Sequence, residues 1–196
     1  MAAEMERISR TVRDTYDEAG RRAGQSELID GVPYDLPSPT LLHQILAYET
    51  GRELSRCSDE SGHSVVLPVP IEVRLDRDTR TAVLPDIAVV CRKEQIRDHF
   101  VFGAPDLIAE ILSPETAYKD RFLKLMKYMN AGVREYWIVD PLSGTVMVYE
   151  KDAAVVPMTY TFDDDVPVGI WNRTCGVGFR GIRERIAGLP LSVSLA

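Results

Sequence analysis

Short apolar runs bounded by turn residues predict most of the strands in this chain. Residues 106–112 and 135–140 are almost wholly apolar, which is typical of strands buried on both faces of a sheet. Further strands, several of them expected to pair as hairpins across polar turns, are predicted at residues 27–34, 65–75, 81–91, 145–150 and 157–162.

Helical spacing of apolar residues predicts the remaining elements. Ser38 as N-cap and Pro39 as first helical residue indicate a helix that runs to about Cys57. Shorter helices are expected at residues 4–19, 93–99 and 179–187.

The clearest helix is predicted at about residues 116–131. Its apolar positions recur at intervals of three and four residues, so one face should pack on the core. That face is formed by Phe122, Leu125, Met126 and Met129, and Gly132 suits a left-handed cap at the end of the helix.

The order of these elements predicts the fold class. Strand 106–112, helix 116–131 and strand 135–140 suggest a strand–helix–strand unit, whose crossover should be right-handed if the strands are parallel. Since the hairpins add antiparallel strands, we expect an α/β (α+β) fold with one mixed central sheet flanked by helices. The 196 residues suffice for a single domain at residues 25–196, preceded by a helical extension at residues 1–24.

Two acidic residues interrupt the apolar strands. Glu110 lies within the run 106–112, and Asp86 lies within residues 82–90. A buried carboxylate costs several kcal/mol unless it is paired or binds a metal. Two such acids on neighbouring strands predict a site for Mg²⁺ or Mn²⁺, which prefer oxygen ligands. Alternatively, Glu110 pairs with an Arg or Lys, and Asp86 merely begins a strand after Pro85.

Composition and charge narrow the functional classes. The net charge of −7 counts against non-specific coating of nucleic acid, and no apolar run is long enough for a membrane span. The polar, acidic N-terminus does not resemble a signal peptide, and we expect a cytoplasmic protein. Three widely spaced cysteines count against a disulfide framework and against a zinc cluster: Cys57, Cys91 and Cys175. A local basic patch comprises Lys119, Arg121, Lys124, Lys127 and Arg134. It is either a surface that contacts nucleic acid or a helix face exposed to solvent.

The order of several motifs resembles the Uma-type endonucleases, a bacterial family of the PD-(D/E)XK, or restriction-endonuclease-like, superfamily. The resemblance covers about residues 25–185 and is specific because the motifs occur together. They are Glu27-Leu-Ile-Asp-Gly31, Ser38-Pro39 with His43, Leu84-Pro-Asp-Ile-Ala-Val-Val90, Gly103-Ala-Pro-Asp-Leu-Ile-Ala-Glu-Ile-Leu-Ser-Pro-Glu-Thr116, Asp120, Lys124, Tyr128 and Gly132-Val-Arg-Glu-Tyr-Trp-Ile-Val-Asp-Pro141.

The resemblance implies a metal-dependent phosphodiesterase. Asp86 and Glu110 match the two acids, which would hold Mg²⁺ or Mn²⁺ with the carbonyl of Ile111. The lysine of the superfamily pattern is replaced by Leu112, and Lys124 of the following helix looks like its substitute. The site would be completed by Glu27 and His43.

The position of Lys124 leaves its role open. On a helical wheel it lies with Asp120 and Tyr128, opposite the predicted apolar face, so it would point to solvent. It can serve catalysis only if a cleft forms between this helix and a covering N-terminal helix. His43 has the alternative of an ordinary helix histidine, and Asp120 that of an i, i+4 partner of Lys124.

Three functional hypotheses follow. The first is a Mg²⁺-dependent endonuclease that acts on nucleic acid. The second is an inactive nuclease-fold module that binds nucleic acid or protein. The third is a structural homodimer, in which the apolar segment 166–171 lies either at an interface or in the core.

Overall fold

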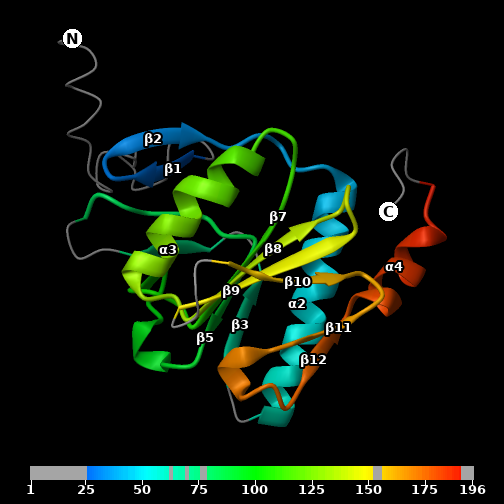
Figure 1. Cartoon of the computed structure of the whole chain (residues 1–196). Helices are drawn as coiled ribbons and strands as arrows, with labels where there is room; N and C mark the ends of the chain where they lie inside the picture. The colour runs from blue at the N-terminus through cyan, green and yellow to red at the C-terminus, as the bar shows by residue number, and fades with distance from the viewer. Residues whose placement is uncertain (1–25, 62–63, 69–70, 76–78, 152–155, 191–196) are drawn as a thin grey trace.

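A mixed central sheet organises the protein (Figure 1). The computed structural model describes residues 26–61, 64–68, 71–75, 79–151 and 156–190, and six strands of this part form the sheet. The predicted helical extension at residues 1–24 lies outside the described residues. The strands are, in spatial order, β10 (Met158–Thr161), β9 (Thr145–Glu150), β8 (Glu135–Asp140), β7 (Leu107–Ile111), β5 (Ile87–Val90) and β3 (Val65–Pro68).

Strand pairing confirms the predicted mixed sheet. β7 and β8 are parallel, with Glu110 opposite Ile138, whereas the other neighbouring strands of the sheet are antiparallel. β8 returns into β9 through a turn in which Gly144 has a φ of 62°, a conformation that glycine adopts readily.

Smaller strand pairs surround the sheet. β1 (Ser26–Ile29) and β2 (Val32–Asp35) form a hairpin where a strand broken by a glycine turn was predicted at residues 27–34, with positive φ at Asp30 and Gly31 as in a type I′ turn. The other pairs are β4 (Glu72–Arg74) with β6 (Phe100–Phe102), and β11 (Asp165–Pro167) with β12 (Gly176–Gly178).

The predicted strand 65–75 is divided. β3 ends at Pro68, which has no N–H to continue a sheet ladder, and β4 leaves the central sheet to pair in parallel with β6. In place of a helix at residues 93–99 the structure has only the 3₁₀ turn η2 (Lys93–Gln95).

The long helix α2 (Leu41–Ser61) starts later than predicted. Thr40 caps it, since the backbone N–H of His43 donates to Thr40 Oγ1 at 3.2 Å. Ser38 therefore lies outside the helix. The predicted helix at residues 179–187 is confirmed as α4 (Phe179–Ala187).

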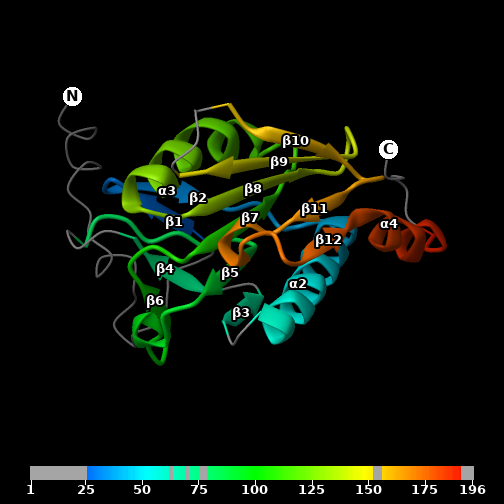
Figure 2. The same ribbon diagram turned by 60° about the horizontal axis from the view of Figure 1, so that its bottom comes forward.

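Two apolar cores lie on opposite faces of the sheet. Leu107 and Trp137 point to the face that packs on α2 and α4. Ile108 and Ile138 point to the other face, which packs on α3 (Leu125–Ala131). Figure 2 shows these helices on the two sides of the sheet.

The expected apolar face of helix 116–131 is only partly correct, because Leu125 and Met129 pack on the core but Phe122 and Met126 do not. Phe122 and Met126 are 58% and 55% exposed, whereas Asp120 and Lys124 are each 2% exposed. The polar side of the helix faces the sheet because buried carboxylates there provide partners for Lys124. The segment Lys119–Lys124 is a π-helix, η3, that continues into α3 and ends at Gly132 with a φ of 102°, the predicted left-handed cap.

The expectation that the cysteines form no disulfide is also wrong. Cys57 of α2 and Cys175, just before β12, form a disulfide although they are 118 residues apart in sequence. Close packing of α2 against β12 brings them together, and an odd cysteine count concealed the pair because Cys91 remains free.

The segment 166–171 packs in the core. Val166 and Val168 are fully buried and Trp171, in the 3₁₀ turn η4 (Gly169–Trp171), is 7% exposed, which confirms core packing over an interface role for these residues. Within the described ranges, no helix combines the length and the apolar character required to cross a lipid bilayer.

Candidate active site

The antiparallel register of β5 and β7 brings the two predicted acids together. Ile87 of β5 pairs with Ala109 of β7, so the next residues, Asp86 and Glu110, lie opposite each other on the two neighbouring segments. The N–H of Asp86 lies 3.3 Å from Glu110 Oε2, and the N–H of Ile111 donates to Asp86 Oδ2 at 2.7 Å. The strand register therefore fixes the distance between the two carboxylates.

Glu110 is a buried carboxyl group, 3% exposed, on the α3 face of the sheet. Its Oε1 accepts hydrogen bonds from Lys124 Nζ at 2.8 Å and from the Tyr128 hydroxyl at 2.7 Å. Burial raises the pKa of Glu110 to about 8, an effect that Lys124 opposes and that Asp120 reinforces. The sequence motif contained Tyr128, but its bond to Glu110 was not predicted.

Lys124 lies at the centre of the site and points inward. Its Nζ is 2.6 Å from Glu27 Oε1, 2.8 Å from Glu110 Oε1 and 3.5 Å from Asp120 Oδ1. Burial disfavours the ammonium, but the charges of Glu110 and Glu27 outweigh it and hold the pKa of Lys124 well above its usual value. Among the described residues, β1 covers Lys124 through Glu27, while the predicted N-terminal helix lies outside the described residues.

Glu27 also pairs with a second lysine, Lys119, which the sequence placed only in a basic patch. Glu27 is fully buried, its Oε1 accepts the N–H of Leu84 at 3.0 Å, and its Oε2 lies 2.7 Å from Lys119 Nζ. Burial alone would raise the pKa of Glu27, but Lys124 and Lys119 together lower it. The two lysines are five positions apart, a spacing that a π-helix places on one side, and the sequence carried no signal for a π-helix.

His43, near the start of α2, completes the group. Its Nε2 is 3.1 Å from Asp86 Oδ2, and its Nδ1 has no hydrogen-bond partner in the part of the chain that the structure describes. Burial opposes protonation, but the hydrogen bond and charge of Asp86 raise the pKa of His43 above its ordinary value. The structure thus brings all five predicted side chains, Asp86, Glu110, Lys124, Glu27 and His43, into one cluster.

The cluster fits a hard divalent cation that keeps most of its waters. Glu110 Oε2 has only the long contact with Asp86 N, and no described residue donates a hydrogen bond to Asp86 Oδ1. These oxygens, with the Ile111 carbonyl, are the ligand type of Mg²⁺ or Mn²⁺. Among the described residues there is no set of three or more His, Cys, Asp or Glu side chains arranged for a metal, as a zinc cage would require.

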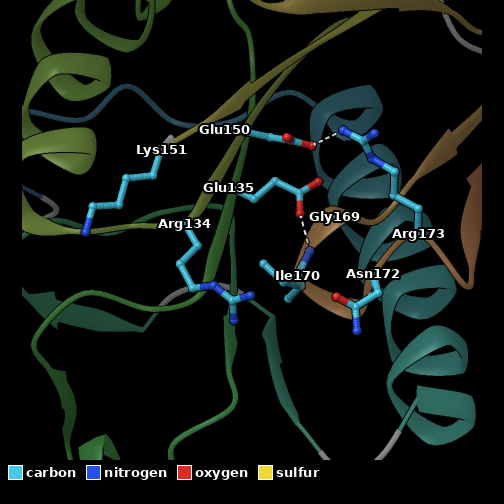
Figure 3. Close-up of a pocket in the computed structure, with 8 residues that line it drawn as sticks. All are labelled: Arg134, Glu135, Glu150, Lys151, Gly169, Ile170, Asn172 and Arg173. Carbon is cyan, nitrogen blue, oxygen red and sulfur yellow. Dashed lines mark hydrogen bonds and ion pairs between the residues drawn. The ribbon is translucent and has the colours of Figure 1, made fainter. Parts of the chain in front are cut away.

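A pocket of about 560 Å³ lies elsewhere, at the start of β8 on the α2 face (Figure 3). Buried Glu135 is at its centre and accepts hydrogen bonds from Trp137 Nε1 at 2.7 Å and from the N–H of Ile170 at 2.8 Å. A Cβ at Gly169 would lie 2.9 Å from Glu150 Oε1 and 3.0 Å from Glu135 Oε2, so a larger residue there would require these carboxylates to shift. The pocket and the cluster around Glu110 therefore occupy opposite faces of the sheet.

Comparison with known proteins identifies the class. The family model for Uma2, described as "Putative restriction endonuclease", matches residues 13–169. The chain therefore belongs to the Uma2 family, as its motifs predicted.

A solved structure shares the fold. It is described as a "putative nuclease belonging to DUF820" from Anabaena variabilis ATCC 29413, and superposes with a TM-score of 0.69 at 19% sequence identity. The match covers 88% of this chain and 97% of that one, which confirms the predicted fold class. A search of curated proteins gave no match.

Proposed function

We propose that this chain is a divalent-metal-dependent endonuclease that hydrolyses phosphodiester bonds in nucleic acid. Membership in the Uma2 family and the nuclease-like fold support the class of activity. The single observation that carries the mechanism is the inward position of Lys124, at 2.8 Å from Glu110. Lys124 of the helix therefore lies beside Glu110. Two residues after Glu110 the chain has Leu112 and not a lysine.

Each residue has a distinct task in this proposal. Asp86, Glu110 and the Ile111 carbonyl would hold Mg²⁺ or Mn²⁺, which when bound supplies Lewis-acid polarisation and a more acidic water. Lys124 donates hydrogen bonds toward the attacking water and stabilises the negative charge that develops on the phosphate. Glu27 and Tyr128 fix Lys124 and Glu110, while His43 orients Asp86.

The test is cleavage of labelled DNA and RNA with Mg²⁺ or Mn²⁺, with and without EDTA, by wild type and Glu110→Gln. We expect cleavage that requires the metal and falls by about 10²–10³-fold in Glu110→Gln. Glu135→Gln is the matched control, because it removes another buried carboxylate from the central sheet on the opposite face, and it should leave cleavage within about twofold. Cleavage that ignores both EDTA and Glu110→Gln would overturn the proposal.

The inactive-module hypothesis makes the opposite prediction for metal binding. The observation that favours the inactive module is that Lys124 and Tyr128 already donate hydrogen bonds to Glu110 Oε1. Calorimetric titration with Mn²⁺ should show binding that is lost in Asp86→Asn and Glu110→Gln if the enzyme proposal holds. Binding of nucleic acid without any Mn²⁺ binding would favour the module instead.

A further inference from the structure

Of the two lysines of the ionic cluster, Lys119 is the one closer to solvent, and its exposure is similar to that of His43 and Asp86, which are 15% and 14% exposed. Its side chain is 12% exposed, against 0% for Glu27, 3% for Lys124 and 4% for Glu110. A phosphodiester that approaches from solvent can therefore reach Lys119 before it reaches Lys124. We infer that Lys119 is the residue that contacts the substrate phosphate, an inference that rests on the proposed nuclease function.

The charge balance of the cluster supports this assignment. Four carboxylates face two ammonium groups, and they are Glu27, Asp86, Glu110 and Asp120 against Lys119 and Lys124. A divalent cation bound to ionised Asp86 and Glu110 would offset the excess of carboxylates, and His43 adds a positive charge when it is protonated. Loss of Lys119 would make the loaded site more negative by one charge and weaken its attraction for a phosphodiester anion.

Lys119 also has the freedom to exchange partners. Its Nζ is 2.7 Å from Glu27 Oε2, and no other described carboxylate forms an ion pair with it. Glu27 would remain paired with Lys124 at 2.6 Å if Lys119 turned to a phosphate. An ammonium presents three donors, so Lys119 can also bridge Glu27 and a phosphate oxygen.

Two other cations of the same helical segment do not share this position. Arg121 pairs with Asp140 at 2.7 Å, and Lys127 pairs with Asp30 of the β1–β2 turn. Neither of these carboxylates belongs to the cluster. Lys127 is therefore a matched control, since it is a lysine of similar exposure, 17%, that pairs with an acid from the same hairpin.

The first experiment measures binding without catalysis. Fluorescence anisotropy of labelled single-stranded and duplex DNA and RNA, with Ca²⁺ as the oxygen-binding divalent cation in place of Mg²⁺, compares wild type, Lys119→Met and Lys127→Met over a range of salt. We expect Lys119→Met to weaken binding about 5–10-fold and to reduce the slope of log K against log salt by about 0.7–0.9, the value for one phosphate contact. Lys127→Met should bind within about twofold of wild type.

A second pair of variants separates phosphate contact from simple neutralisation of Glu27. Lys119→Arg keeps the charge and should restore binding to within about threefold of wild type. The double variant Glu27→Gln with Lys119→Met removes both charges. If Lys119 only neutralised Glu27, the double variant would bind like wild type, whereas loss of a phosphate contact leaves it as weak as Lys119→Met.

The outcomes are distinguishable. Lys119→Met that binds like Lys127→Met, or a double variant that regains wild-type affinity, overturns the inference. Wild type that binds nucleic acid but never cleaves it overturns the nuclease proposal and still allows the Lys119 test. Wild type that binds neither DNA nor RNA overturns both.

Discussion

Two buried glutamates, one on each face of the central sheet, have opposite surroundings. Glu110 on the α3 face contacts a buried ammonium and lies among other carboxylates. Among the described residues, Glu135 on the α2 face accepts hydrogen bonds from neutral groups, including the Trp137 indole and the Ile170 N–H. Burial raises the pKa of both carboxyl groups, so neither burial nor a raised pKa separates a candidate catalytic acid from a structural one.

The two faces also differ in how they are held together. On the α2 face, a disulfide and an apolar cluster join α2 and α4 to the strands. On the α3 face, the helix that covers the sheet exposes Phe122 and Met126 and buries Asp120 and Lys124. A helix that turns its charged side inward gives up apolar burial, which is typical of functional sites and not of structural cores.

The largest effect is expected for Lys124→Met, which tests whether the inward lysine distinguishes the two faces. Cleavage should fall about 10³-fold, because the charge that stabilises the transition state is lost. Stability should also fall, by about 3–5 kcal/mol, since buried carboxylates lose their ammonium partner. Kinetics of oligonucleotide cleavage and urea unfolding measure the two effects.

The control for Lys124→Met is Lys124→Arg, which keeps the charge and should retain more of the stability than of the activity. Cleavage by Lys124→Met at the wild-type rate would contradict the catalytic role of this lysine. The cluster would then be a structural device like the hydrogen-bonded Glu135.

A smaller effect on stability, and none on chemistry, is expected from the α2 face. The double variant Cys57→Ser with Cys175→Ser removes a cross-link between residues 118 apart in sequence. The free energy of unfolding should fall by about 2–4 kcal/mol, while cleavage should stay within about twofold because the ionic cluster lies on the other face. Urea unfolding with and without dithiothreitol measures this loss.

Cys91→Ser is the matched control for the disulfide, because Cys91 is a free, partly buried thiol. It should change stability by less than about 1 kcal/mol. If the double variant unfolds at the same urea concentration as wild type, the disulfide does not stabilise the α2 face, and the contrast between the faces is weaker than the structure indicates.

Much of the fold could be predicted because local patterns encode it. The apolar runs became β7 and β8, and the four-residue turn before Thr145 became the β8–β9 connection. The anomaly of two acids in apolar strands located Asp86 and Glu110, because burial of charge is costly wherever the strand lies in the sheet.

The errors arose where distant partners decide the structure. A helical wheel assigns Lys124 to solvent because it cannot include Glu27, which lies 97 residues earlier in the chain and reaches the helix only through the β1–β2 hairpin. The same limit concealed the Cys57–Cys175 bond and the role of Glu27 as partner of Lys119. Periodicity predicts the face that packs on apolar residues, and here the packed face also contains the buried ionic cluster.

The smallest expected loss of stability among these variants comes from removal of the aromatic hydrogen-bond donors of the two glutamates. These donors also allow the closest comparison between Glu110 and Glu135. Tyr128 donates to Glu110 and Trp137 donates to Glu135, each at 2.7 Å. Burial and nearby Glu110 raise the pKa of Tyr128 well above its usual value, so its hydroxyl remains a donor at neutral pH.

Tyr128→Phe should cost about 1–2 kcal/mol of stability and lower cleavage about tenfold, because Glu110 loses one of the two donors that fix its Oε1. Trp137→Phe should lower stability at least as much but leave cleavage within about twofold. Equal cleavage by the two variants would show that the orientation of Glu110 does not limit the reaction, and that the contrast between the two faces lies in Lys124 alone.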